Sequence, residues 1–481
     1  MRTHRSRWTA ASIVAAVLAA LVIPSSAAGA VGAVVTGPVA PDTGPTAGGT
    51  TVQVDASNPQ KVIKQITAGL ASVILFEDGT ASAFGNGTDG SLGNGKFEDS
   101  DVPVAVSIPE GTRFTSMASG AFHTVAIDQD GKLWSWGRGW SGQLGVGYEV
   151  GARRPAPVPV AAPDGVRFVS VAAQTQLSFA LTDTGELWAW GVNGEGQLGV
   201  GEDAIVVWAP MRVLLPEAVT SFGISTSHAI ASLESGAVYA WGQNNYGEIG
   251  NPNPSRLPIP MTVPDGVTFP GPVAAGGDVS YAKGSDGAWY GWGNNTDGLL
   301  GPNGLNGRNE QPVELVVPDG VDLLDITNHY RTSAAITADG SVYTWGYGRN
   351  GRLGNGSEAS TNVPGRIDVD AVDHVIVGGA FFLAFTAPDT ILGWGLESRI
   401  GLDSKVPVPL HSYGVANVAS VTFDGVPAAS FEQPVDGVLD AVTPPHASGV
   451  VDVEVTWSDS HRNTYADAFT FGTPPVVTVD P

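Results

Sequence analysis

The chain has 481 residues, of which 47 are acidic and 23 are basic, so its formal net charge at pH 7 is −24. A field of that sign repels nucleic acid and anionic membrane surfaces, and neither is expected as a partner. The sequence contains no cysteine, which excludes disulfides and thiolate metal sites, and its length leaves room for more than one domain with a sizeable core.

The first thirty residues have the pattern of a secretion signal. Arg2, Arg5 and Arg7 form a basic start, an apolar run covers residues 10–23, and small residues follow at 28–30. An uncleaved anchor helix is the alternative, but the apolar run is short for a bilayer. We therefore predict a signal peptide over 1–30 and a secreted, extracellular protein. Removing the three arginines would change the net charge from −24 to −27. Whether the protein stays at the cell surface is left open.

Residues 31–58 contain a turn-rich stretch and then one extended segment. Glycine and proline cluster over residues 41–49, and alternating β-branched residues follow at Thr50–Val54. This segment is predicted to be a strand.

The middle of the chain repeats itself. The sequence Trp190-Gly191-x-Asn193-x-x-Gly196-Gln197-Leu198-Gly199 recurs in variant form, with spacings of 49 to 54 residues. The equivalents of Gly191 are Gly85, Gly137, Gly242, Gly293, Gly346 and Gly395, which makes seven copies. Self-similarity at such a period indicates units that bury their apolar faces against their neighbours.

Each copy is predicted to contain four short strands. In the copy over 167–200, strands are expected at 168–173, 177–182 and 186–190, followed by a Gly-rich segment and a last extended piece. Asp-Gly pairs at residues 78, 130, 286 and 339 share one position and favour two-residue hairpin turns. Four antiparallel strands repeated seven times predict an all-β fold, a seven-bladed β-propeller over residues 59–411.

One aromatic position and the glycine after it are common to the copies. A large ring at a fixed place in each blade can fill the wedge between blades, and the glycine permits close backbone approach. We therefore assign a structural blade-packing role to Trp136, Trp190, Trp241, Trp292, Trp345 and Trp394, and to Gly137, Gly191, Gly242, Gly293, Gly346 and Gly395.

The combined motifs resemble a known family. Ala118–Ala126 reads Ala-Ser-Gly-Ala-Phe-His-Thr-Val-Ala, and with the Asp-Gly, Trp-Gly and Gly-Gln-Leu-Gly motifs it is similar to the regulator of chromosome condensation repeat. The resemblance covers roughly residues 61–409, and copies five and seven depart most. It implies a seven-bladed propeller, as in a chromatin-bound exchange factor for a small GTPase and in the bacterial β-lactamase inhibitor protein II. A kelch propeller is the distant alternative.

After residue 411 the pattern changes to that of a small β-sandwich. Alternating strands are expected around 418–423, 451–457 and 469–471. Residues 412–473 resemble the later strands of an IPT/TIG immunoglobulin-like domain, and residues 44–52 resemble its first strands. We infer one sandwich built from both ends of the chain (31–58 and 412–473), with the propeller inserted between them and a tail at 474–481. This requires pairing between residues 44–55 and 418–472.

No catalytic constellation, metal site or cofactor is expected. His123 and His228 occupy one position of the repeat, where other copies carry Leu177, Val279 and Phe381, so they are interpreted as core residues. The remaining histidines are scattered, and no nucleophile elbow is present. The acidic run at 98–101 could hold Ca²⁺ but lacks the spacing of an EF-hand loop. We therefore expect a non-enzyme.

Binding is the better candidate, because loops at one face of a propeller form a ring. Aromatic and arginine side chains dominate protein interfaces, which selects Phe122, Tyr330 and Arg331 in the loops before the second strands. The family resemblance supports the two aromatic residues, since inhibitor members engage enzymes with such loops. Trp140 and Tyr246 in the Gly-rich segments are further candidates, although exposed aromatic residues can also merely pack on neighbouring loops.

These observations predict a secreted, non-enzymatic binding or adhesion scaffold, expected as a monomer, that engages an extracellular protein or glycan through a propeller face. An extracellular enzyme inhibitor similar to the β-lactamase inhibitor is the first alternative. Guanine-nucleotide exchange is the second alternative, which the predicted export and the acidic charge both disfavour.

Overall fold

The computed structural model describes residues 39–40, 43–55, 63–148, 152–369, 371–378, 380–386, 390–397, 402–409, 418–432, 438–457 and 462–472. The predicted signal peptide and tail lie outside these ranges. The described chain divides into two compact units, a large one over the repeats and a small one from the two ends of the chain. Within the described ranges, no helix is long and apolar enough to cross a membrane.

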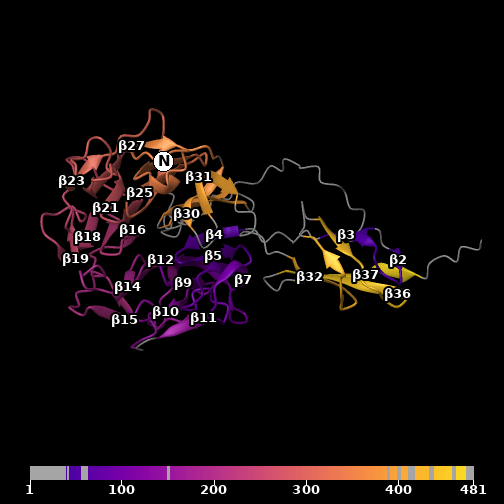
Figure 1. Ribbon diagram of the computed structural model, residues 1–481. Coiled ribbons are helices and arrows are strands. Elements are labelled where there is room, and N and C mark those ends of the chain that lie inside the picture. The colour runs from indigo at the N-terminus through magenta and orange to yellow at the C-terminus, as the bar shows by residue number, and fades with distance from the viewer. Residues whose placement is uncertain are drawn as a thin grey trace, which may run out of the picture. The chain divides into compact units, whose positions relative to one another are not determined.

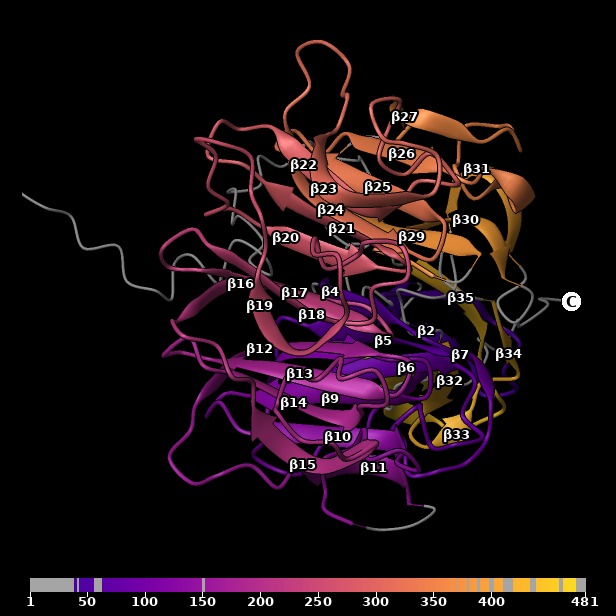
Figure 2. The same ribbon diagram turned by 90° about the vertical axis from the view of Figure 1, so that its left-hand side faces the viewer.

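The large unit is a β-propeller of seven four-stranded antiparallel sheets, each built from four consecutive strands (Figures 1 and 2). Blade 1 contains β4 (Ile63–Ala68), β5 (Ala71–Phe76), β6 (Ala81–Gly85) and β7 (Ser100–Ala105). Blade 2 contains β8 (Phe114–Ser119), β9 (His123–Asp128), β10 (Leu133–Arg138) and β11 (Arg153–Pro159). Blade 3 contains β12 (Phe168–Gln174), β13 (Leu177–Thr182), β14 (Leu187–Val192) and β15 (Val206–Arg212).

Blades 4 to 7 repeat this arrangement. Blade 4 contains β16 (Val219–Ile224), β17 (His228–Leu233), β18 (Val238–Gly242) and β19 (Ser255–Pro260). Blade 5 contains β20 (Val273–Gly276), β21 (Val279–Lys283), β22 (Trp289–Asn294) and β23 (Arg308–Glu314). Blade 6 contains β24 (Leu323–His329), β25 (Thr332–Thr337), β26 (Val342–Gly346), the 3₁₀ turn η1 (Arg349–Gly351) and β27 (Thr361–Arg366). Blade 7 contains β28 (Val372–Val377), β29 (Phe381–Thr386), β30 (Thr390–Glu397) and β31 (Leu402–Pro409).

Packing between neighbouring blades closes the ring. The second strand of most blades is buried along its whole length, because its two faces contact the two adjacent blades. Blade 1 packs on blade 7 through a shared core that includes Ile66 and Phe84 from one and Phe381 and Leu383 from the other. Closure therefore comes from apolar side chains, and all four strands of each blade are consecutive in sequence.

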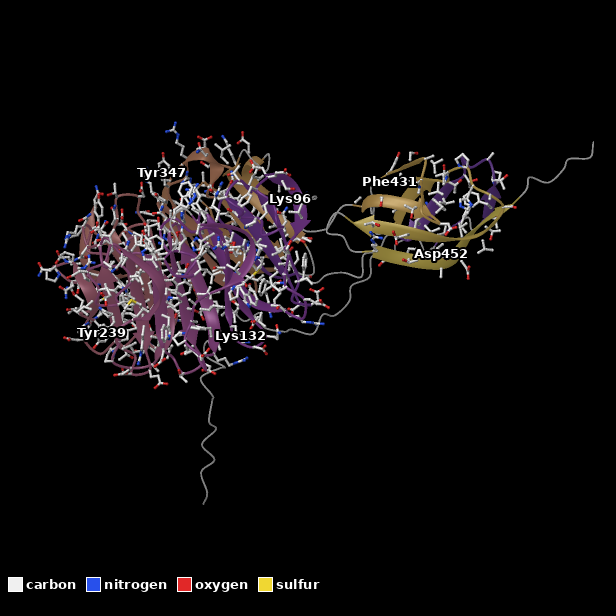
Figure 3. The ribbon with its side chains drawn as sticks, turned by 90° about the horizontal axis from the view of Figure 1, so that it is seen from below. Lys96, Lys132, Tyr239, Tyr347, Phe431 and Asp452 are labelled. Carbon is white, nitrogen blue, oxygen red and sulfur yellow. The ribbon has the colours of Figure 1, made fainter. Side chains whose placement is uncertain are left out.

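The strand order defines two faces of the propeller. At one face lie the loops between first and second strands (69–70, 120–122, 175–176, 225–227, 277–278 and 330–331) and the Gly-rich segments between third and fourth strands; we call it the loop face. The amide of Arg138, at the end of β10, donates to the carbonyl of Phe122 at 2.8 Å, which places both at this face. Tyr347 and Lys96 lie toward this edge in Figure 3, and Lys132 and Tyr239 lie toward the opposite edge.

The small unit consists of two sheets that share one core. The first has the order β1 (Val39–Ala40), β3 (Thr51–Asp55), β35 (Val438–Val442) and β34 (Ser430–Phe431). The second has the order β2 (Thr43–Pro45), β37 (Arg462–Gly472), β36 (Gly449–Trp457), β32 (Val418–Phe423) and β33 (Val426–Pro427). Apolar side chains of both sheets, such as Val52, Leu439, Val453 and Phe469, form one cluster.

Strands from the two ends of the chain pair within this unit. Thr51–Asp55 is antiparallel to Val438–Val442, and Thr43–Pro45 is parallel to Thr470–Gly472. The indigo N-terminal strands therefore lie beside the yellow C-terminal ones (Figure 1). The pairing required by the split-domain hypothesis is present.

Candidate functional site

The common tryptophan position links each of blades 2 to 7 to the blade before it. The six rings are buried, and each indole nitrogen donates to a backbone carbonyl in the preceding Gly-rich segment at 2.8–3.1 Å. These donors are Trp136, Trp190, Trp241, Trp292, Trp345 and Trp394. The repeated tryptophan thus fills the space between blades and satisfies a buried carbonyl there.

Two glycine positions of the repeat are required by close contacts. Gly191 has a φ of +109°, and a Cβ there would collide with the carbonyl oxygen of Gln176 in the loop before the second strand. Gly145 has a φ of +67°, and its Cβ would lie 2.8 Å from the indole nitrogen of Trp190 in the next blade. The second contact was not foreseen from sequence, and it explains why the Gly-Gln-Leu-Gly motif accompanies the tryptophan.

His123 and His228 lie in the interior. Nε2 of His123 is 2.8 Å from Oγ of Ser178, and Nε2 of His228 is 2.9 Å from Oγ of Ser280. Each serine hydroxyl donates to a backbone carbonyl, so the imidazole must donate from Nε2 and carry no proton on Nδ1. Burial lowers the pKa of both imidazoles to about 3.

These contacts resemble a serine–histidine pair but cannot act as one. Ser178 and His123 are both buried within the blade interface, and the serine proton is committed to the Gln143 carbonyl. A general base requires access to substrate and a pKa near the working pH. Among the described residues, no group of three or more histidine, aspartate or glutamate side chains could hold a metal ion.

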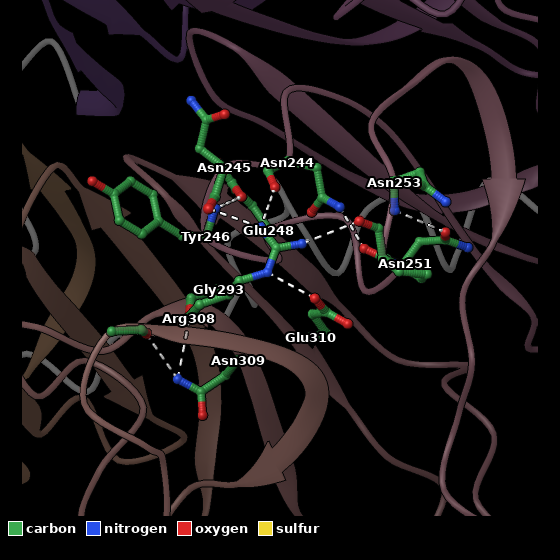
Figure 4. Close-up of polar contacts among 12 residues, drawn as sticks. Asn244, Asn245, Tyr246, Glu248, Asn251, Asn253, Gly293, Arg308, Asn309 and Glu310 are labelled. Carbon is green, nitrogen blue, oxygen red and sulfur yellow. Dashed lines mark hydrogen bonds and ion pairs between the residues drawn. The ribbon is translucent and has the colours of Figure 1, made fainter.

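An arginine on an outer strand fastens some blades to the preceding Gly-rich segment. Arg308 of β23 donates to the carbonyls of Asn244 and Asn245 at 2.7 and 2.8 Å and lies 2.7 Å from a carboxylate oxygen of Glu310 (Figure 4). Arg256 makes the equivalent contacts one blade earlier. The hydrogen bonds of Arg308 hold the segment that presents Tyr246.

The five predicted binding residues form two separate clusters at the loop face. In the first, the guanidinium of Arg138 lies 3.9 Å from the ring centre of Phe122 and 4.5 Å from that of Trp140. Its Nε donates to a carboxylate oxygen of Asp89 at 2.9 Å. Trp140 keeps 51% of its surface exposed, whereas Phe122 is partly buried. Arg138, which organises this cluster, was not selected from sequence.

The second cluster surrounds a hollow of about 480 Å³. Tyr246, Tyr330 and Arg331, from blades 4 and 6, all line it, together with the loop of blade 5 at Gly277–Val279. Tyr246 and Tyr330 are 39% and 62% exposed. The structure thus brings together three predicted residues that are distant in sequence.

Arg331 is held by several neighbours. Both oxygens of Asp297 accept hydrogen bonds from its guanidinium at 2.5 Å, and the guanidinium carbon lies 4.1 Å from the ring centre of Tyr347. The bond to Asp297 is the main cause that raises the pKa of Arg331. Asp297 lies two residues before Leu299, and Asp89 lies two residues before Ser91, so the two aspartates occupy the same position of the repeat. Aligning the copies in the sequence shows this correspondence.

Tyr330 adopts an unusual backbone conformation. Its φ is +53°, and Gly277 has a φ of +54° at the equivalent position of blade 5. A side chain in this region costs roughly 1–2 kcal/mol relative to glycine. His329, beside it, packs its ring 5.0 Å from the tyrosine ring, and burial is the main cause that lowers the pKa of this histidine.

A closed propeller with loops of varied chemistry at one face defines a repeat-built scaffold, and such loops are where binding residues are usually found. The chain belongs to the regulator of chromosome condensation (RCC1) repeat family: the family model matches residues 78–127, 130–181, 184–232, 235–282 and 339–384, just over half of the chain. The matches leave out residues 283–338, which contain much of the hollow.

Relatives and solved structures agree with this assignment. The chain is 30% identical to the ultraviolet-B receptor UVR8 of Arabidopsis thaliana over 332 residues, covering 67% of this chain and 73% of the receptor. It is 26% identical to the human E3 ubiquitin-protein ligase HERC2 over 340 residues, covering 68% of this chain but 7% of the ligase.

Among solved structures, human WBSCR16 matches with a TM-score of 0.62 at 21% identity, over 76% of this chain and 99% of that one. Prp20p of Saccharomyces cerevisiae matches with a TM-score of 0.62 at 20% identity, over 80% and 93%. At these identities the likeness shows the propeller fold alone.

Proposed function

We propose that this protein is a secreted, non-enzymatic scaffold that binds an extracellular protein or glycan through the loop face of its propeller. The observation that carries the proposal is the gathering of Tyr246, Tyr330 and Arg331 around one hollow. Exposed aromatic and arginine side chains supply most of the binding energy in protein interfaces. Their positions come from loops on a rigid ring, the usual place for recognition residues.

The relatives support a binding or regulatory role for such propellers. One of them is a receptor, and Prp20p has binding properties toward Gsp1p and histones. Ligase activity is not proposed, because the chain spans only 7% of HERC2. Export is proposed from the basic and apolar pattern of residues 1–30 together with the net charge of −24.

The small unit is proposed to be an IPT/TIG immunoglobulin-like domain split by the propeller. Its two sheets with a common core and its pairing between Thr51–Asp55 and Val438–Val442 support this assignment. We propose that it serves as a spacer or as a second adhesion module.

Affinity capture tests the proposed face. The mature chain, residues 31–481, is immobilised and exposed to culture medium and cell-wall extract, beside Phe122→Ala and Tyr330→Ala variants. Leu324→Ala is the matched control, because Leu324 is 52% exposed at the start of β24, the end of that strand away from the loop face. We expect one or more partners to be lost with Tyr330→Ala and kept with Leu324→Ala.

Equal recovery of every partner by all variants would remove the loop face from the proposal. The same preparations are assayed against secreted hydrolases, because an enzyme inhibitor would use the same exposed loops. Inhibition that depends on Phe122 or Tyr330 would identify the partner as an enzyme.

A further inference from the structure

The hollow at blades 4 to 6 has the size of a small-ligand site. Its volume of about 480 Å³ lies within the range of roughly 300–1,000 Å³ typical of such sites. Thr226 and Ser227 of blade 4, Asp278 of blade 5 and Tyr330 of blade 6 line it, so three loops enclose it. A single lysine or arginine side chain of a partner would fill only part of this space.

Neutral hydrogen-bonding groups make up much of the lining. The amides of Gln243 and Asn294 and the hydroxyls of Ser227 and Thr296 all border the hollow. The Asn294 side-chain carbonyl oxygen accepts from the amide and hydroxyl of Thr296 at 2.9 and 2.7 Å, which fixes the orientation of its amide group. Such a lining suits a ligand with many donors and acceptors and disfavours an apolar one.

Among the described residues, the side chains that line the hollow include no uncommitted lysine or arginine to pair with an anionic ligand. Arg331 is committed to both oxygens of Asp297, and its guanidinium also packs on Tyr347. Asp278 accepts one long contact, 3.5 Å from Asn294, and among the described residues no ion pair involves it. Its carboxylate therefore keeps acceptor capacity for hydroxyl donors.

Two aromatic rings stand at the rim. Tyr246 projects from the segment fastened by Arg308, and Tyr330 is held at a φ of +53° by its short loop. Both rings are exposed, and neither belongs to the buried core between blades. A pyranose ring presents an apolar C–H face beside its hydroxyl groups, and aromatic side chains offer the flat, amphipathic surface on which that face can stack.

We propose that this hollow binds a neutral oligosaccharide. Tyr246 and Tyr330 stack on sugar rings. The Asp278 carboxylate accepts hydrogen bonds from sugar hydroxyls, and the Asn294 side-chain amide donates to neighbouring hydroxyls. The inference rests on the proposed function and names the ligand class of the same face. Asn294 and Tyr330 lie in residues 283–338, which the family model does not match, whereas Tyr246 and Asp278 lie in the matched residues 235–282.

An array of oligosaccharides followed by titration calorimetry tests the proposal. The array carries neutral oligomers of glucose, galactose, mannose and N-acetylglucosamine, with uronate-containing and sulfated oligomers as the anionic arm. A tetralysine peptide serves as the cationic arm. We expect a neutral oligomer to bind, with its Kd raised at least tenfold by Tyr330→Ala and by Asp278→Asn and unchanged by Leu324→Ala. Thermal unfolding of each variant establishes that it is folded.

Three outcomes would overturn the oligosaccharide assignment: no neutral oligomer binds at millimolar concentration, both hollow variants bind as wild type does, or tetralysine binds in a manner that depends on Asp278. Affinity capture separates this failure from that of the proposed function. If Tyr330→Ala loses a partner that is captured equally well before and after periodate oxidation of its sugars, the scaffold proposal stands and the oligosaccharide proposal fails.

Discussion

Acidification should destabilise this protein, with a large contribution from the buried His123 and His228. In the folded state burial lowers the pKa of His123 and His228 from 6.5 to about 3, while the unfolded chain keeps the ordinary value. Between those values the unfolded state binds more protons, so stability falls as the pH drops from 6.5 toward 3 and is unaffected by these groups above 6.5. At pH 5 each histidine should remove roughly 2 kcal/mol, about 4 kcal/mol for the pair.

The geometry explains why protonation is so unfavourable. Nδ1 of each ring is buried and lacks a hydrogen-bond partner, and the serine beside Nε2 already donates to a carbonyl. A proton added at Nδ1 would be a buried charge with no acceptor, which is among the most costly arrangements in a protein interior.

The assay compares wild type with His123→Leu/His228→Leu. Leucine is chosen because Leu177 occupies the same position in blade 3, and each serine keeps its carbonyl acceptor. Guanidinium unfolding, followed by tryptophan fluorescence at several pH values from 7.5 to 4.5, gives the free energy of unfolding. Other titrating groups cancel in the difference, so the wild type should lose roughly 4 kcal/mol more than the variant on going from pH 7.5 to pH 5. Parallel curves would refute the reasoning.

Three further predictions concern the blade contacts and the hollow. Gly145→Ala should destabilise the propeller by about 1–3 kcal/mol more than Gly147→Ala in denaturant unfolding, because both have positive φ but only the first meets a tryptophan ring; equal costs would contradict this. Tyr330→Gly should raise the unfolding free energy by roughly 1 kcal/mol over Tyr330→Ala, since only glycine relieves the strain at φ +53°; an unchanged midpoint would count against strain. Arg308→Ala should lower it by about 1–2 kcal/mol, with partial recovery in Arg308→Lys, because lysine cannot bridge several carbonyls; full recovery would show that charge alone suffices.

Much of the blade architecture could be predicted from local patterns. The strands expected at 168–173, 177–182 and 186–190 are found at Phe168–Gln174, Leu177–Thr182 and Leu187–Val192. Apolar–polar alternation and Asp-Gly turns depend only on residues close together in sequence, so they can be recognised without knowing the spatial neighbours of a strand. Seven such units predict the ring, because each unit leaves apolar faces that only the adjacent units can cover.

The composition of the loop-face clusters could not be predicted in this way. Tyr246 and Arg331 meet at one hollow although they belong to blades 4 and 6, because loop length and direction decide how far each side chain reaches. The sequence does not predict the role of Arg138, because that role depends on the spatial contacts of its guanidinium with the rings of Phe122 and Trp140. Asp89 pairs with Arg138, and Asp297 pairs with Arg331. The two aspartates occupy the same position of the repeat, but the two arginines do not, so aligned copies alone do not predict these pairs.

Tyr330 shows why departures between copies are more informative than the shared positions. The equivalent place in blade 5 is Gly277, which adopts the same left-handed conformation without strain. A tyrosine in that conformation costs roughly 1–2 kcal/mol, and with 62% of its surface exposed it returns little of this through burial. Packing therefore does not account for the residue. Under the proposed oligosaccharide binding, recognition accounts for it, because the strained loop holds an aromatic ring beside the hollow, where a smaller residue would present no ring surface to the ligand.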